Sequence, residues 1–240
     1  MIAINLNVEI NMSADFVSLL FLAGTVAIYA CSKKLYLRYR KFWLSPILIS
    51  PILLFVTIEL TQTPFLIYFQ DTRWLTWLLG PATIAFAYPI YTQRMLLRRY
   101  PITLMIGVLV GFGLGILSSM LLARIFHLPP DLVRSSLPRS VSTPFALLAS
   151  KSFGGDQNLT VICVMITGVF GIFISDTFLN WLGLRSGISK GAALGASAHG
   201  FGTSKAYEIG GEEGAVASIV MVFTGITMVL LAPVVAYWVN

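Results

Sequence analysis

Apolar segments of membrane length constrain this chain more than any other feature of its sequence. Residues 101–122 and 215–239 contain no charged side chain, and residues 159–182 contain only Asp176. A helix needs about 20 such residues to cross a bilayer. Charged residues form 11% of the 240-residue chain, against roughly 25% in soluble domains. The sequence therefore predicts an all-α polytopic membrane protein, with residues 1–240 forming a single membrane domain.

We expect about six spanning helices, at residues 15–31, 43–60, 74–92, 101–122, 159–182 and 215–239. Basic residues cluster directly after the first and third of these segments, and short loops rich in Lys and Arg stay in the cytoplasm. This pattern predicts that both termini lie on the non-cytoplasmic side. It also accounts for the net charge of +6 without a nucleic-acid partner. Pro81 and Pro89 interrupt the third segment, where we expect a broken helix.

Two stretches of the chain are too polar to face lipid. They are residues 137–155, LPRSVSTPFALLASKSFGG, and residues 194–211, LGASAHGFGTSKAYEIGG. Ionisable groups at membrane depth usually face a cavity or a partner. We expect both stretches to be discontinuous or re-entrant, and to form the facing halves of one polar site.

An internal repeat relates these two stretches. At an offset of 57 residues, identical residues coincide at several positions, among them Leu137/Leu194, Ser140/Ser197, Thr167/Thr224 and Gly168/Gly225. The copies cover about residues 137–182 and 194–239, with a weaker copy at about 79–124. Polar stretches that cross fully would make the copies parallel, whereas re-entrant stretches would make them inverted. The distribution of basic residues does not separate the two, and we favour the inverted form, which is typical of transporters.

The first polar stretch holds four candidate substrate-binding residues between two helix-breaking prolines: Arg139, Ser140, Ser142 and Thr143, between Pro138 and Pro144. Each proline keeps the residue before it out of helical geometry, so we expect an unwound backbone here. The planar fork of Arg can bond both oxygens of a carboxylate, which predicts a receptor for a small organic acid. Alternatively, Arg139 reaches toward the interface and serves as a topology anchor.

The second stretch supplies the remaining candidates for the binding site: Ser197, His199, Gly200 and Thr203. His199 titrates near neutral pH and is a candidate for coupling the substrate to a proton. Alternatively, it is a neutral histidine that bonds a carbonyl of another helix. Lys205 and Glu208 are three residues apart and are candidates for a coupling pair or an ordinary interfacial ion pair.

Motifs of soluble enzymes are missing from the sequence. It contains no Gly-x-Ser-x-Gly elbow, no P-loop and no dinucleotide fingerprint. Cys31 and Cys163 have no metal-ligand spacing. We therefore expect no enzymatic activity, no cofactor and no metal site.

The two polar stretches carry a resemblance to a known family. Residues 137–144, LPRSVSTP, resemble the L-P-K-S-V-T-T-P signature of the LrgB/CidB family, and residues 196–208, ASAHGFGTSKAYE, resemble its A-S-H-x-x-G-T-A-R-x-x-E signature. The likeness extends over about residues 15–240. The chain departs from the signatures at Arg139, where Lys is usual, at Ser142, at Ala198 before the histidine, and at Lys205, where Arg is usual.

The resemblance implies a multi-pass protein of the bacterial inner membrane that acts with a small holin-like partner of the LrgA/CidA type. Some members of the family are antiholin-like modulators of murein hydrolase activity and cell lysis, and related plastid proteins are carriers of glycolate and glycerate. The polar residues favour a carrier of small monocarboxylates, and the resemblance implies acids such as pyruvate or glycolate. An antiholin-like modulator without transport of its own is the alternative. The glycine-rich faces also permit a homo-oligomer.

Overall fold

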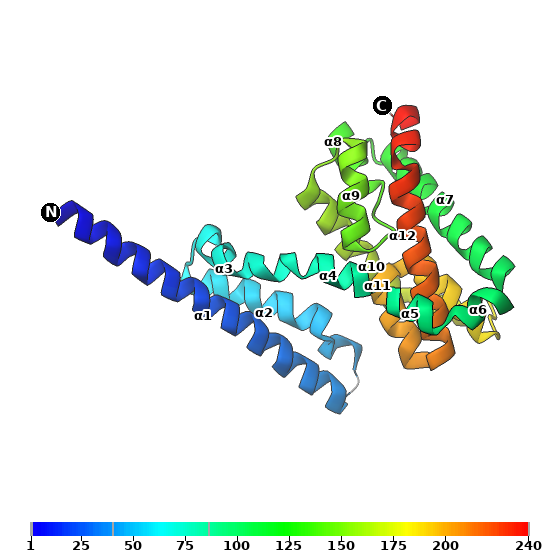
Figure 1. Ribbon diagram of the computed structural model, residues 1–240, viewed down its shortest axis with the longest axis horizontal. Coiled ribbons are helices and arrows are strands. Elements are labelled where there is room, and N and C mark those ends of the chain that lie inside the picture. The colour runs from blue at the N-terminus through cyan, green and yellow to red at the C-terminus, as the bar shows by residue number, and fades with distance from the viewer. Residues whose placement is uncertain (1, 40, 86, 240) are drawn as a thin grey trace. The chain divides into compact units, whose positions relative to one another are not determined.

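The computed structural model describes residues 2–39, 41–85 and 87–239, and every regular element within these ranges is a helix. The chain divides into two compact units, Met1–Pro81 and Ala82–Asn240 (Figure 1). The prediction of an all-α polytopic membrane protein is confirmed. Among the described residues, four helices are long and apolar enough to cross a membrane: Asp15–Tyr39 within α1, and α7, α10 and α12.

The first unit is built on one long helix. Helix α1 (Ile2–Tyr39) packs against α2 (Pro46–Thr61) and α3 (Phe65–Trp77), with the short 3-10 turn η1 (Phe42–Leu44) leading into α2. A polar contact joins α1 to α3, because the hydroxyl of Ser18 donates to Asp71 at 2.7 Å. Helix α2 has 16 residues, so the second expected span is shorter than a typical membrane helix.

The third expected span, residues 74–92, is divided into short pieces. Helix α3 ends at Trp77, and α4 (Leu79–Ala85) and α5 (Ala87–Thr92) follow, before α6 (Arg94–Arg99). Pro81 and Pro89 are each the third residue of their helix. A proline in the first turn removes no helical hydrogen bond. Pro81 thus lies just after a helix break at Leu78, within the segment where the sequence predicts a broken helix.

The second unit contains three long helices and three that bear the polar stretches. The long ones are α7 (Pro101–Ile125), α10 (Gln157–Trp181) and α12 (Gly211–Val239). The others are α8 (Pro130–Ser136), α9 (Thr143–Phe153) and α11 (Gly187–Ile209). Helix α12 contacts α7, α9 and α11 and holds the largest share of the buried residues. Within this unit, α8 lies at the end of α12 that leads to the C-terminus (Figure 1).

Candidate functional site

Helix α11 is a hairpin rather than one continuous rod. Ala198 and His199 have non-helical torsions, and His199 has φ 41° and ψ −127°. A positive φ is rare for a residue other than glycine. The two ends of α11 meet again, because a Cβ atom on either Gly187 or Gly210 would collide with the side chain of Glu213. We call residues 187–209 hairpin 2, and residues 197–200 its tip.

The contacts of hairpin 2 with α12 show the reversal of direction. In its first arm, Gly191 lies against Glu213, and Gly195 lies against Ala217, so residue numbers rise together. In its second arm, the Thr203 hydroxyl approaches the Met221 sulfur at 3.6 Å, whereas Tyr207 lies against Gly214. The second arm therefore runs antiparallel to α12, whereas the first arm runs parallel to it. The arms also touch each other, because Gly202 packs on Leu194.

Residues 130–153 form a second structure of this kind, which we call hairpin 1. Its first arm is α8, its tip is residues 137–142, and its second arm is α9. The Ser135 hydroxyl accepts from the Asp156 backbone N–H at 2.8 Å, so the chain returns to α8 where α9 has ended. In the second arm, the hydroxyls of Ser150 and Thr160 are 2.8 Å apart. The tip has no regular helix between Pro138 and Ser142, as expected, but Leu137 before Pro138 keeps helical torsions of φ −54° and ψ −47°, contrary to the expectation.

The two hairpins approach the middle of α7 from opposite ends. Hairpin 2 follows α7 upward in numbering, because Gly107 faces Ala192 and Gly111 faces Ala196. Hairpin 1 follows α7 in the reverse direction. Ser119 donates to the Ser136 carbonyl at 3.1 Å, and Gly115 packs against the Ser140 side chain. The tips therefore stop one helical turn apart, at Gly111 and Gly115.

Arg139 on the tip of hairpin 1 is held by three hydroxyl groups. Its Nε donates to Ser119 Oγ at 3.0 Å, its Nη2 to Ser118 Oγ at 2.9 Å and its Nη1 to Thr167 Oγ1 at 3.2 Å. No ion pair to Arg139 occurs within the described residues. The three hydroxyls that bind Arg139 lie on α7 and α10, two of the helices that are long and apolar enough to cross a membrane.

Two other hydroxyls of this tip are buried without a partner. Ser140 is 7% exposed and Ser142 is 6% exposed, and neither Oγ has a hydrogen-bond partner in the described part of the chain. Ser142 is the N-cap of α9, yet its side chain makes no capping bond. A buried hydroxyl without a partner costs roughly 1–3 kcal/mol. The first N–H groups of α9, at Thr143 and Phe145, add positive dipole at the same place.

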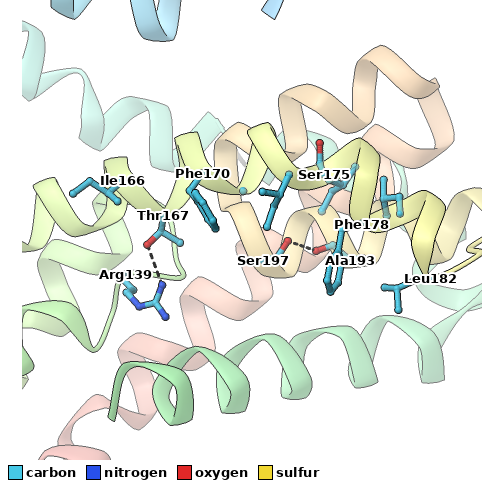
Figure 2. Close-up of a pocket in the computed structure, with 13 residues that line it drawn as sticks. Arg139, Ile166, Thr167, Phe170, Ser175, Phe178, Leu182, Ala193 and Ser197 are labelled. Atoms are coloured by element: carbon cyan, nitrogen blue, oxygen red, sulfur yellow. Dashed lines mark hydrogen bonds between the residues drawn. The ribbon is translucent and has the colours of Figure 1, made fainter. Parts of the chain in front are cut away.

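A cavity of about 370 Å³ begins at Arg139 and follows α10 and the first arm of hairpin 2. Figure 2 shows Arg139 and Thr167 at one end of this cavity and Leu182 at the other. Its polar wall residues are Arg139, Thr167, Ser175 and Ser197, and the rest of the wall is apolar. The cavity thus offers one cation, three hydroxyls and a largely apolar lining.

The structure brings only part of the predicted site to this cavity. Arg139 and Ser197 line it, whereas Ser140, Ser142, Thr143, His199, Gly200 and Thr203 do not. His199 is 2% exposed, and its Nε2 lies 3.2 Å from the Val164 carbonyl oxygen. Since a carbonyl only accepts, Nε2 carries a proton and donates. His199 therefore bonds a carbonyl of another helix, which is the second of the two roles considered for it.

Lys205 has a closer acidic partner than Glu208. Its Nζ lies 3.0 Å from Asp176 Oδ2 on α10 and 3.8 Å from Glu208 Oε2. Asp176 is 67% exposed, so this pair is an outer contact between hairpin 2 and α10.

Three residues of the site were not predicted as such. Ser118, Ser119 and Thr167 hold the guanidinium of Arg139. Signals for them were present. Ser118 and Ser119 follow Gly115 by three and four residues, which places them on its face of the helix. Thr167 coincides with Thr224 in the repeat.

Comparison with known proteins gives matches over nearly the whole chain. The family model described as "LrgB-like family" matches residues 25–238. "Uncharacterized protein YxaC" of Bacillus subtilis is 34% identical over 94% of this chain and 98% of the relative. "Uncharacterized protein YwbG" of the same organism is 35% identical over 91% and 97%. "Holin-like protein CidB" of Staphylococcus aureus is 29% identical over 92% and 96%. No solved structure is significantly similar to the chain.

Proposed function

This chain belongs to the LrgB-like family, and we propose that it is a carrier of small monocarboxylates such as pyruvate or glycolate. The proposed site is the tip of hairpin 1 together with the cavity beside it. The observation that supports this most is the bonding of Arg139: three neutral hydroxyls on helices of membrane-spanning length hold its guanidinium, and no acidic side chain pairs with it among the described residues.

The charge of the site favours a monoanion. A cation at membrane depth is stable when it is paired, and one carboxylate would complete the guanidinium of Arg139. Three of its five N–H groups are engaged by hydroxyls, which leaves two for a ligand. With a single cation in the cavity wall, a second carboxylate would remain buried and unpaired.

The partnerless hydroxyls support an anion at the same tip. Ser140 and Ser142 have donors to offer and no acceptor among the described residues, and a carboxylate only accepts. The mainly apolar remainder of the cavity suits the short carbon chain of a C2 or C3 acid. His199 lies behind the cavity wall, where it supports the tip of hairpin 2.

Uptake into proteoliposomes tests the proposal. Purified protein is reconstituted with and without the small LrgA/CidA-type partner, and uptake of labelled pyruvate and glycolate is measured. Arg139→Ala should abolish uptake. Arg124→Ala serves as the control, because Arg124 is exposed at the end of α7 and lies outside the site. Malonate should compete poorly because it brings a second charge. Folded, partnered protein that transports no C2 or C3 acid would sink the proposal.

The printed name of the staphylococcal relatives, holin-like protein CidB, favours a second candidate. In that view the chain is an antiholin-like modulator of murein hydrolase activity and lysis, and has no transport of its own. We place it, in either view, in the bacterial inner membrane with both termini outside. Lysis control that survives Arg139→Ala, but is lost when the partner cannot bind, would favour the modulator.

A further inference from the structure

We infer that residues 130–181 and 187–239 are two inverted copies of one unit, each a hairpin followed by a long helix. We further infer that the hairpin tips are gates on opposite sides of the proposed site. The gating part rests on the carrier function proposed above, whereas the inverted arrangement does not. Each copy extends upstream of the repeat seen in the sequence and includes the first arm of its hairpin.

Contacts within each copy recur at the offset of 57 residues. In the first copy, the chain at Gly155 and Asp156 meets Ser135. In the second copy, Glu213 meets Gly191. The second arm repeats the pattern, because Ser150 meets Thr160 and Tyr207 meets Ser218. When the first-copy residues are shifted by 57, each falls on its second-copy counterpart or on the residue next to it.

Contacts between the copies are exchanged reciprocally, as a two-fold axis requires. A Cβ atom on Gly168 of α10 would collide with Phe201 and His199 in hairpin 2. The equivalent Gly225 of α12 packs on Phe145 in hairpin 1. Each long helix therefore receives the hairpin of the other copy at the same position. A two-fold axis along the membrane normal would give the same exchange between parallel copies, so the relative direction of the copies is decided by helix α7.

Helix α7 fixes the direction of each hairpin. Hairpin 1 runs along α7 from its C-terminal end to Gly115, and hairpin 2 runs from its N-terminal end to Gly111. A spanning helix has its ends on opposite faces of the membrane. The hairpins thus enter from opposite faces and stop near the middle, where Arg139 lies.

The gating role follows from how tightly the tips are held. Gly111, Gly115, Gly168 and Gly225 leave no room for a Cβ atom against the opposing hairpin. Each hairpin can move away from the glycine it packs against without breaking a spanning helix. This movement opens a path to the site only from the membrane face at which that hairpin enters. The ligand charge is met by one copy alone, because Ala196 stands where the first copy has Arg139.

Cysteine labelling tests the inverted arrangement without any measurement of transport. Cys31 and Cys163 are first replaced by Ser. Single cysteines are then introduced on either side of hairpin 2 by Arg185→Cys and Glu212→Cys. For hairpin 1 they are introduced in its first turn by Asp131→Cys and just after its end by Gln157→Cys. All four positions are exposed. An impermeant maleimide is applied to right-side-out and inside-out vesicles.

The two positions around hairpin 2 should label from one face, and the two around hairpin 1 from the other. Labelling of the Arg185 and Glu212 positions from opposite faces would show that residues 187–209 cross the membrane and would overturn the inference. Correct labelling in a protein that transports no acid would refute the carrier function and leave the inverted arrangement standing.

A second measurement tests the gates. Ser197→Cys places a reporter in the cavity wall, and its labelling is compared from both faces. Gly168→Ala and Gly225→Ala, which displace different hairpins, should shift labelling toward opposite faces. Gly113→Ala is the matched control, since no atom lies within 4 Å of its Cβ position, and should leave the labelling unchanged. A shift toward the same face in both variants, or none in either, would refute gating by the hairpins.

Discussion

Arg139 on the tip of hairpin 1 donates through Nη1 to the hydroxyl of Thr167 on α10, at 3.2 Å. This bond joins the tip of hairpin 1 to α10, the helix that also contacts hairpin 2 at Gly168. Thr167 lines the cavity and orients the guanidinium toward it. The proposed anion site therefore depends on a residue from outside both polar stretches.

Thr167→Val should weaken substrate binding with little loss of fold. The substitution keeps the shape of the side chain and removes one acceptor of Arg139, which is worth about 1 kcal/mol, or about a fivefold rise in apparent KM for uptake. Thr167→Ser should restore the value. Thr224→Val is the control, since Thr224 is the repeat equivalent and bonds only the Val220 carbonyl within the described residues. An equal effect of both valine variants would assign Thr167 to stability alone.

Arg139→Lys should retain transport, whereas Arg139→Gln should lose it. Lysine keeps the charge and gives up the two-pronged geometry of the guanidinium. Glutamine leaves the anion without a counter-charge, at a cost of about 2 kcal/mol or more, and hence at least about 30-fold in affinity. Uptake at several pyruvate concentrations measures both variants. Equal activity of the glutamine variant and the parent would remove Arg139 from the site.

His199→Ala should lower the free energy of unfolding by about 1–3 kcal/mol, because it leaves the Val164 carbonyl buried without its hydrogen-bond donor. The loss is measured by unfolding in detergent. His199→Asn is the informative companion, because Asn tolerates positive φ better than most residues and keeps a donor. It should be more stable than the alanine variant. Since His199 lies outside the cavity wall, the pH dependence of uptake should be unchanged in His199→Asn; a large change would restore a proton-coupling role.

Gly202→Ala should destabilise hairpin 2. The added Cβ would meet the Leu194 carbonyl and the Ala198 side chain, and overpacking of this kind costs about 1–3 kcal/mol. Gly113→Ala lies in a helix of the same unit with open space around it, so it should be neutral or stabilising by up to about 1 kcal/mol. Unfolding curves of the two variants in detergent are compared. Equal stability would mean that the arms do not pack as described.

The sequence predicted the class of the protein and the position of its unwound segments for physical reasons that are visible in one dimension. Long apolar runs identify α7, α10 and α12, and Pro138 and Pro144 identify the tip of hairpin 1. The proximity of Gly168 to Phe201 and of Arg139 to Ser118 depends on how helices pack in three dimensions, which no local pattern contains. The ion pair between Asp176 and Lys205 was not predictable either, since a single acidic residue in an apolar run does not indicate which basic residue pairs with it.

The exchange of contacts between the copies has a consequence for how the protein is made. Hairpin 2 packs against Gly168, which has already been synthesised when the hairpin leaves the ribosome. Hairpin 1 packs against Gly225 on α12, the last helix of the second unit. The hairpin that carries Arg139 can therefore bond α7 and α10 early, but it lacks its contact with Gly225 until α12 has been made.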